Sequence, residues 1–244
     1  MDGLGGLPAQ TFKLLKTILE AKDQAVRNEV ILAQIEGIRT HEDRIQQVLE
    51  LFRAVQDRAK REGIKIFLVG QSAGGSAVRI AASRLKGQKE LAGVILLSQA
   101  MPRGIVFMTM PLAKAMWAKV RSVLFGEVIH TTEEQYGSLI EPIPVTEWAD
   151  AVLNRQPLSG PESRDLALWF NTPALQSYEC PTLDIWGELD QWISATAHRK
   201  LYGLLRKLCR DVSYMEVPGS GHLTLASSQK YEVIRKIMEW TSKL

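Results

Sequence analysis

The sequence has few cysteines, no long apolar run and almost no excess of one charge sign. Its 244 residues include only Cys180 and Cys209, too few for a disulfide framework and not at metal-ligand spacing. No apolar stretch approaches the ~20 residues of a membrane-spanning helix, and the first ten residues do not resemble a secretory signal. The 30 basic and 27 acidic residues give a net charge of +3, too even a balance to indicate nucleic-acid binding. We therefore expect a soluble, cytoplasmic protein with no metal or organic cofactor.

Short apolar runs alternate with helix-length segments along the chain. The runs that predict strands covered on both faces are 64–69, 93–98, 182–186 and 212–217. One helix is expected to open at Thr40 and Asp43 in a capping-box pattern. A second follows Ser72 and ends near Gly87, and a third runs to the C-terminus. This alternation predicts the α/β class, with a mostly parallel sheet flanked by helices and joined by right-handed crossovers.

The alternation breaks between residues 101 and 170. An amphipathic helix is expected over 111–125, followed by a stretch rich in Pro, Thr and Glu. The segment is too long for a plain loop, so we interpret 101–170 as a helical lid inserted into the fold. Residues 1–100 and 171–244 then form the core domain.

The segment GQSAGG, residues 70–75, lies where a predicted strand ends and a helix begins. A serine on so tight a turn needs small neighbours, because its backbone is strained and the helix passes close by. The turn exposes the hydroxyl of Ser72 and places the N–H of Ala73 near a developing oxyanion. The G-x-S-x-G pattern alone also occurs in structural glycine-rich turns. Its position between strand and helix favours a nucleophile.

A serine hydroxyl needs a neighbouring base to act as a nucleophile. The sequence offers four histidines. His41, His130 and His198 fall in or beside helical or lid segments, where we expect solvated surface residues. His222 follows the last predicted strand in a glycine-containing loop, and the alternative is an ordinary loop histidine. We predict that His222 is the base.

The third member of a triad holds the imidazole in one tautomer and stabilises its charge. Asp190 follows the penultimate predicted strand in the segment WGELD and is the favoured acid, with Glu188 as the second choice. Asp184 lies within the strand and is expected to point into the sheet packing. The chain order Ser72, Asp190, His222 brings all three to one edge of the sheet.

From about residue 30 to the C-terminus the sequence resembles the α/β-hydrolase-fold serine hydrolases of the lidded esterase/lipase type. The segments that carry the resemblance are LVGQSAGG, GVILLSQAMP, CPTLDIWGELD and VPGSGHLTL. Their combination is specific for the fold and not for a substrate. The resemblance implies an ester-cleaving triad of Ser72, Asp190 and His222.

Proteins of this type usually carry an H-G-x-G-G loop that supplies the second oxyanion N–H. Residues 2–6, DGLGG, resemble this loop, with Asp2 at the usual histidine position. The resemblance therefore assigns the second N–H to Leu4. The strands expected before this loop are absent, so we expect a shortened fold or an incomplete N-terminus. Reduced activity or self-association, as in a homodimer, is the expected consequence.

The lid is the main guide to the substrate. Its adaptable apolar side chains are Met101, Met108, Met110, Met116 and Trp117. We expect Met101, Met116 and Trp117, together with Gln71, to bind a small-molecule ester with an apolar acyl or alcohol part. The alternative is that the lid residues only pack the lid onto the core. Hydrolysis of carboxylic esters is the favoured function; a thioesterase, amidase or C–C hydrolase, or a non-catalytic binding protein, are the alternatives.

Overall fold

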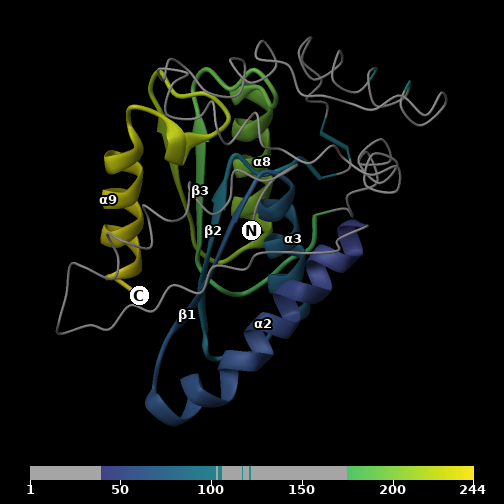
Figure 1. Cartoon of the computed structure of the whole chain (residues 1–244), viewed down its shortest axis with the longest axis vertical. Coiled ribbons are helices and arrows are strands. Elements are labelled where there is room, and N and C mark those ends of the chain that lie inside the picture. Colours follow the sequence, from purple (N-terminus) through teal and green to yellow (C-terminus); the bar gives the residue numbers. More distant parts are fainter. Residues whose placement is uncertain (1–39, 103, 106–116, 118–120, 122–174) are drawn as a thin grey trace.

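In the part of the chain that the structure describes, a four-stranded parallel sheet forms the centre (Figure 1). The computed structural model describes residues 40–102, 104–105, 117, 121 and 175–244. Within them the strands are β1 (Ile66–Gln71), β2 (Leu91–Leu97), β3 (Thr182–Gly187) and β4 (Val212–Val217). Each strand pairs in parallel with the next along the chain, in the order β1-β2-β3-β4. All four carboxyl ends therefore lie at the same edge, and the predicted α/β class is confirmed.

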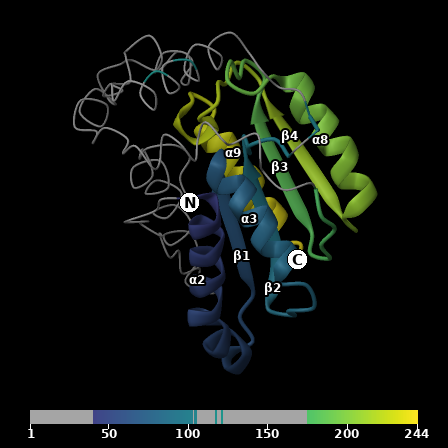
Figure 2. The same cartoon turned by 90° about the vertical axis from the view of Figure 1, so that its right-hand side faces the viewer.

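Helices cover both faces of this sheet (Figures 1 and 2). The helices are α2 (His41–Glu62), α3 (Ala73–Arg84), α8 (Ala195–Leu208) and α9 (Lys230–Thr241), with a short 3-10 helix η3 (Thr224–Ala226). Side chains of α2, α3 and α8 pack in one apolar cluster, while those of α9 and η3 pack in another. No helix in the described part of the chain is long and apolar enough to cross a membrane.

The central strand β2 shows why an unbroken apolar run forms here. Val94 and Leu96 belong to the cluster under α2 and α3, whereas Ile95 and Leu97 belong to the cluster under α9. Successive side chains of a strand point to opposite faces, so a strand covered on both sides buries every one of them. Each of these side chains contributes about 1.5–3 kcal/mol through burial.

Helix α2 begins with the capping box that the sequence predicts. The N–H of Thr40 donates to Asp43 Oδ2 at 2.8 Å, and the N–H of Asp43 donates to Thr40 Oγ1 at 3.1 Å. The helix ends at Gly63 in the left-handed region, with φ of 65°. The N–H of Ile64 still donates to Ala59 O at 2.9 Å. For that reason β1 starts at Ile66 and not at the predicted residue 64.

Other boundary predictions also differ from the structure: β2 starts at Leu91 and ends at Leu97, and β3 ends at Gly187. Helix α3 ends at Arg84, before the predicted end near Gly87. Strand β1 runs on to Gln71, because Gly70 and Gln71 still pair with Leu96 and Leu97 of β2. The predicted lid, residues 101–170, lies almost entirely outside the described residues.

Candidate active site

Ser72 occupies the sharp turn between β1 and α3. Its backbone has φ of 52° and ψ of −121°, a left-handed φ that is uncommon for a residue with a side chain. Hydrogen bonds on both sides hold this strained turn: the N–H of Ser72 donates to Leu97 O at 2.9 Å, and Ser72 O accepts from the N–H of Ala100 at 2.9 Å. The N–H of Ser76 also donates to Ser72 O, at 3.2 Å.

The glycines around Ser72 allow helix and strand to approach one another. A Cβ atom on Gly70 would lie 2.4 Å from Gly74 O, and one on Gly75 would lie 2.8 Å from Gln99 Cβ. Any side chain at these two positions would push α3 away from the sheet. The GQSAGG segment thus has the glycines that this turn requires.

Asp190 and His222 form a buried pair at the same edge of the sheet. Asp190 lies in the loop after β3 and His222 in the loop after β4, and His222 Nδ1 lies 2.7 Å from Asp190 Oδ2. The two side chains are 0% and 4% exposed, respectively. Asp190 Oδ1 accepts from the N–H groups of Trp192 and Ile193, at 2.8 and 2.9 Å. Both oxygens of the carboxylate are therefore held in place.

The surroundings of Asp190 favour its charged form. Burial alone would raise the pKa of its carboxyl group, but the imidazoles of His222 and His198 outweigh burial and hold the pKa well below its usual range. A charged Asp190 fixes the proton of His222 on Nδ1, since a carboxylate only accepts hydrogen bonds. This leaves Nε2 of His222 with a free lone pair.

Backbone hydrogen bonds join the loop of Asp190 to the loop of His222. The N–H of Glu188 donates to Val217 O at 3.0 Å, and the N–H of Leu189 donates to Ser220 O at 2.9 Å. The carboxylate of Glu188 accepts from the N–H of Gly219 at 3.0 Å. Glu188, the second choice for the acid, thus binds the backbone of the histidine loop.

A side chain from β1 connects this pair of loops to the serine turn. Gln71 precedes Ser72 and is 3% exposed. Its Nε2 donates to the carbonyl oxygen of His222 at 3.4 Å. The structure therefore brings Ser72, Asp190 and His222 together at one edge, as the sequence predicts, and their catalytic role remains a proposal.

Other predicted site residues lie in different surroundings. Ala73 is buried as the first residue of α3. Met101 is 1% exposed and packs in the cluster under α2 and α3, whereas Trp117 is 66% exposed. Leu4 and Met116 lie outside the described residues. The sequence reasoning did not find Trp192, whose ring stacks on that of His222 with centroids 6.0 Å apart.

Two expectations about the remaining histidines are wrong. His198 is 0% exposed and lies behind Asp190, because Ala197, His198, Leu201 and Leu205 share the buried face of α8. His41 is half-buried, and its Nε2 lies 3.2 Å from Ser76 Oγ. Burial, Arg44 and Arg79 lower the pKa of His41 to about 4. His130 lies outside the described residues.

Asp184 lies within the packing of the sheet, as expected. Its Oδ1 accepts from Gln99 Nε2 at 3.1 Å, and Gln99 Oε1 accepts from Arg79 Nε at 3.1 Å. Burial raises the pKa of Asp184 to about 6. Among the described residues no group of three His, Cys, Asp or Glu side chains is placed to hold a metal ion.

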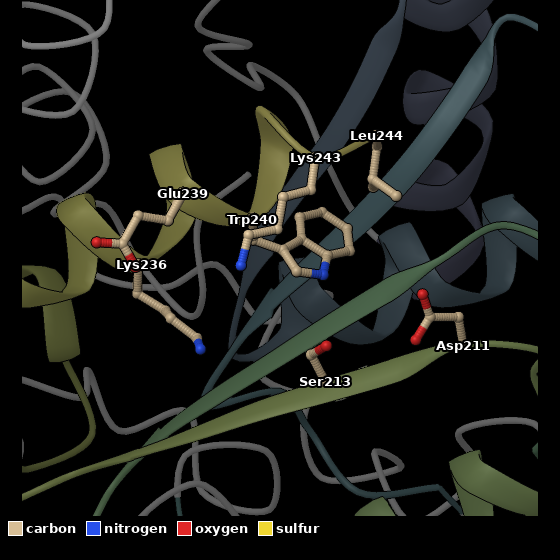
Figure 3. A pocket seen from close by; sticks show the side chains of 7 residues that line it. All are labelled: Asp211, Ser213, Lys236, Glu239, Trp240, Lys243 and Leu244. Carbon is tan, nitrogen blue, oxygen red and sulfur yellow. The ribbon is translucent and has the colours of Figure 1, made fainter.

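Seven residues line a pocket of about 170 Å³ (Figure 3). Its lining residues are Asp211, Ser213, Lys236, Glu239, Trp240, Lys243 and Leu244. Asp211 and Ser213 flank the first residue of β4, so the pocket opens at the amino ends of the strands. Ser72, Asp190 and His222 follow the carboxyl ends. The pocket is therefore separate from the candidate active site.

Residues 32–235 of the sequence match a family model described as the alpha/beta hydrolase family. The match spans most of the chain, and it includes all three candidate residues. The chain belongs to the α/β hydrolase family. The predicted fold and the resemblance to serine hydrolases of this family are thereby confirmed.

Solved structures of α/β hydrolases share this architecture at low sequence identity. A thermophilic esterase from Thermogutta terrifontis has 19% identity and a TM-score of 0.66, covering 98% of this chain and 87% of that chain. A monoacylglycerol lipase from Paleococcus ferrophilus has 20% identity and a TM-score of 0.56, covering 80% and 74%. A soluble variant of the monoglyceride lipase from Saccharomyces cerevisiae has 15% identity and a TM-score of 0.64, covering 85% and 71%. These likenesses support the fold. No match to a curated protein was found.

Proposed function

We propose that this α/β hydrolase cleaves carboxylic esters through an acyl-enzyme formed on Ser72. The observation that carries the proposal is the buried 2.7 Å contact between His222 and Asp190, beside the strained turn of Ser72. A positioned imidazole with a charged acid behind it is what a serine needs to become a nucleophile. The esterase and lipases of similar fold favour an ester as substrate.

In the proposed reaction, Ser72 Oγ attacks the ester carbonyl while Nε2 of His222 takes the hydroxyl proton. Asp190 stabilises the imidazolium that forms, because its carboxylate stays charged. His222 then gives the proton to the leaving alcohol, and the C–O bond of the ester breaks. Water, activated by His222 in the same way, attacks the acyl-Ser72 carbonyl and releases the acid.

The negative oxygen of each tetrahedral intermediate needs N–H donors. We assign the first to the N–H of Ala73, since the opening N–H groups of a helix have no acceptor within the helix. The N–H of Leu4 is the second proposed donor, on the resemblance of residues 2–6 to the usual loop. Removing one such donor costs about 2.7–4 kcal/mol of transition-state stabilisation.

The proposed substrate is a small ester with an apolar acyl or alcohol part. The exposed ring of Trp117 supports this preference, and Met116 is proposed beside it. Met101 is buried in the core, which favours the packing alternative for that residue. Gln71 binds the carbonyl of His222, so we propose that its amide holds the His222 loop against the serine turn.

Hydrolysis of p-nitrophenyl esters of increasing chain length tests the proposal. Replacing Ser72 with Ala is expected to lower kcat by about 10⁴-fold or more, because no nucleophile remains. Ser83→Ala is the matched control, since Ser83 lies on the same helix and its hydroxyl donates to Ile80 O and Gln176 Oε1. The control should keep full activity, and equal loss in both variants would contradict the assignment.

A fluorophosphonate probe separates an enzyme from a binding protein of the same fold, because only an activated serine reacts with it. Labelling that requires Ser72 but comes with no ester hydrolysis would point to thioesters or amides, which the same triad can cleave. Absence of labelling in the folded chain would favour the non-catalytic binding protein.

We also propose that the protein is cytoplasmic and that it forms a homodimer. Cys180 and Cys209 are both free thiols, which is consistent with the reducing conditions of the cytoplasm. The homodimer predicted from the sequence is tested by sedimentation at two protein concentrations.

A further inference from the structure

A second buried imidazole lies beside the acid of the proposed triad. His198 is carried by α8 and is 0% exposed. Its Nε2 lies 3.6 Å from Asp190 Oδ2, the same oxygen that lies 2.7 Å from His222 Nδ1. This distance is too long for a hydrogen bond but short enough for a strong charge interaction in a buried site. Asp190 therefore lies between two histidines.

The ring of His198 is held by stacking. It lies parallel to the ring of Trp186, with centroids 5.5 Å apart and an interplanar angle of 2°. Tyr214 stacks on Trp186 as well, with centroids 5.4 Å apart. The helix that carries His198 is fixed by its N-cap, because Ser194 Oγ accepts from the N–H of Ala197 at 3.3 Å. The position of the imidazole is thus set by α8, β3 and β4 together.

Neither ring nitrogen of His198 has a hydrogen-bond partner within the described part of the chain. Burying polar atoms without partners is costly, so a histidine in this place needs an explanation beyond packing. Nε2 faces a carboxylate, which would repel a nitrogen lone pair. The stable tautomer of His198 therefore carries its proton on Nε2, and the positive end of this N–H bond points toward Asp190.

Several other charged or titratable groups surround His198. Asp184 of β3 interacts with it electrostatically, and Arg79 of α3 reaches Asp184 through Gln99. From β4, the phenol of Tyr214 lies in the stack with Trp186. Among the described residues, Asp190 is the charged group within ion-pair distance of His198.

We propose that His198 is a positioning residue that acts on His222 through Asp190. This inference rests on the proposed function, since it assigns a role within the same triad. The N–H of His198 takes a share of the negative charge on Oδ2, so Asp190 stabilises the protonated form of His222 less than an acid with one partner would. This favours the neutral ring of His222, which is the form that acts as a base.

The test compares two substitutions with different chemistry. His198→Phe keeps the stack on Trp186 and removes both nitrogens, whereas His198→Gln keeps an N–H donor. For His198→Phe we expect the acid limb of the kcat/KM profile to move up by about one pH unit, because the N–H that faces Asp190 Oδ2 is removed. KM should change little. His198→Gln should keep most of the wild-type profile.

Leu201→Val provides the matched control for packing, because Leu201 lies on the same buried face of α8. It should lower stability and leave the pH profile unchanged. If His198→Phe does not fold, His198→Asn, whose amide is too short to reach Asp190, takes its place with the same expected shift. A folded His198→Phe or His198→Asn with a wild-type profile would overturn the inference.

A measurement without turnover separates this inference from the proposed function. The titration of the His222 ring, followed by NMR, is expected to move to higher pH in His198→Phe whether or not the protein cleaves esters. A shift in a chain that hydrolyses nothing would uphold the coupling and reject the esterase proposal. Ester hydrolysis by the wild type, with no shift of the pH profile or of the His222 titration in His198→Phe, would uphold the esterase proposal and reject the coupling.

Discussion

At the scale of single residues, His41 makes stability depend on pH. Burial, Arg44 and Arg79 lower the pKa of its imidazole to about 4 in the folded chain, against 6.5 when unfolded. Between these values the unfolded chain binds a proton that the folded chain does not, so stability is lost as the pH falls from about 6.5 to 4. Over this pH range, we expect the free energy of unfolding of His41→Gln to fall by about 1–3 kcal/mol less than that of the wild type. Urea unfolding at pH 7, 5.5 and 4.5 measures the difference; parallel pH curves for both proteins would contradict it.

Substitution distinguishes the two candidates for the acid in the loop after β3, Asp190 and Glu188. Asp190→Asn is expected to lower kcat by about 10⁴-fold, because an amide no longer enforces the correct tautomer of His222. Glu188→Gln is the matched control, since its side-chain oxygen still accepts from the N–H of Gly219. Steady-state ester hydrolysis checks both. If the Glu188 variant loses as much activity as the Asp190 variant, the acid is wrongly assigned.

The residues of the candidate triad could be predicted from the sequence, because each follows a recognisable strand. The burial of His198 and His41 was not predicted, although the sequence contains a signal for it. His198 precedes Leu201 by three residues and Leu205 by seven, and His41 precedes Ile45 by four, so helical spacing places both on buried faces. What no spacing contains is the contact of His198 with Asp190, which depends on how α8 packs against β3.

At the scale of elements, Gly187 allows the end of β3 to touch the histidine loop. A Cβ atom there would lie 2.1 Å from Gly221 O and 2.3 Å from Ser220 O. We expect Gly187→Ala to destabilise the protein by about 1–3 kcal/mol or more and to lower activity, because backbone cannot yield as a side chain can. Chemical denaturation and ester hydrolysis measure the two effects.

Gly203 is the matched control for this substitution. It lies inside α8, and a Cβ atom there would have no neighbour within 4 Å among the residues that the structure describes. Gly203→Ala is expected to stabilise the protein by about 0.5–1 kcal/mol, the usual gain from replacing a glycine within a helix. A similar loss of stability in both variants would show that the tight contact at Gly187 is not what matters.

The strands were the most predictable elements, because both faces of the sheet are covered and the apolar runs are continuous. The fourth strand matches its prediction, Val212–Val217, at both ends. The first does not, since the backbone of Ile64 completes the end of α2. Helix α8 was not among the predicted elements, although its buried apolar residues recur at helical spacing, so its packing against β3 and β4 was not predicted either.

At the scale of the whole molecule, part of the apolar core lies at the edge of the sheet opposite the candidate active site. Trp240 of α9 packs edge-on against Phe67, with centroids 6.1 Å apart, and lies over Gly93 at the amino ends of the strands. Trp240→Ala is expected to cost about 3–5 kcal/mol of stability. Its kcat, measured where the variant is fully folded, should stay near wild type, because the site lies at the other edge.

Tyr231 is the matched control for this prediction, since it lies on the same helix and is 61% exposed. Tyr231→Ala should change stability by no more than about 0.5 kcal/mol. Loss of kcat in folded Trp240→Ala would show that the two edges are coupled. Thermal unfolding together with initial rates below the transition distinguishes these results.

The order of the strands has a consequence for how fast the protein becomes active when it refolds. β1 and β2 are close in the sequence, but β2 pairs with β3 only after the long segment between Leu97 and Thr182 has been bridged. Such distant pairings form slowly, because the chain must first lose the entropy of a large loop. The turn of Ser72 is in place once β1, α3 and β2 have formed, because Leu97 and Ala100 hold it. The proposed pair of Asp190 and His222 arrives only with β3 and β4. Recovery of hydrolysis will therefore trail the recovery of helical signal, and the interval between them will time the joining of the two halves of the sheet.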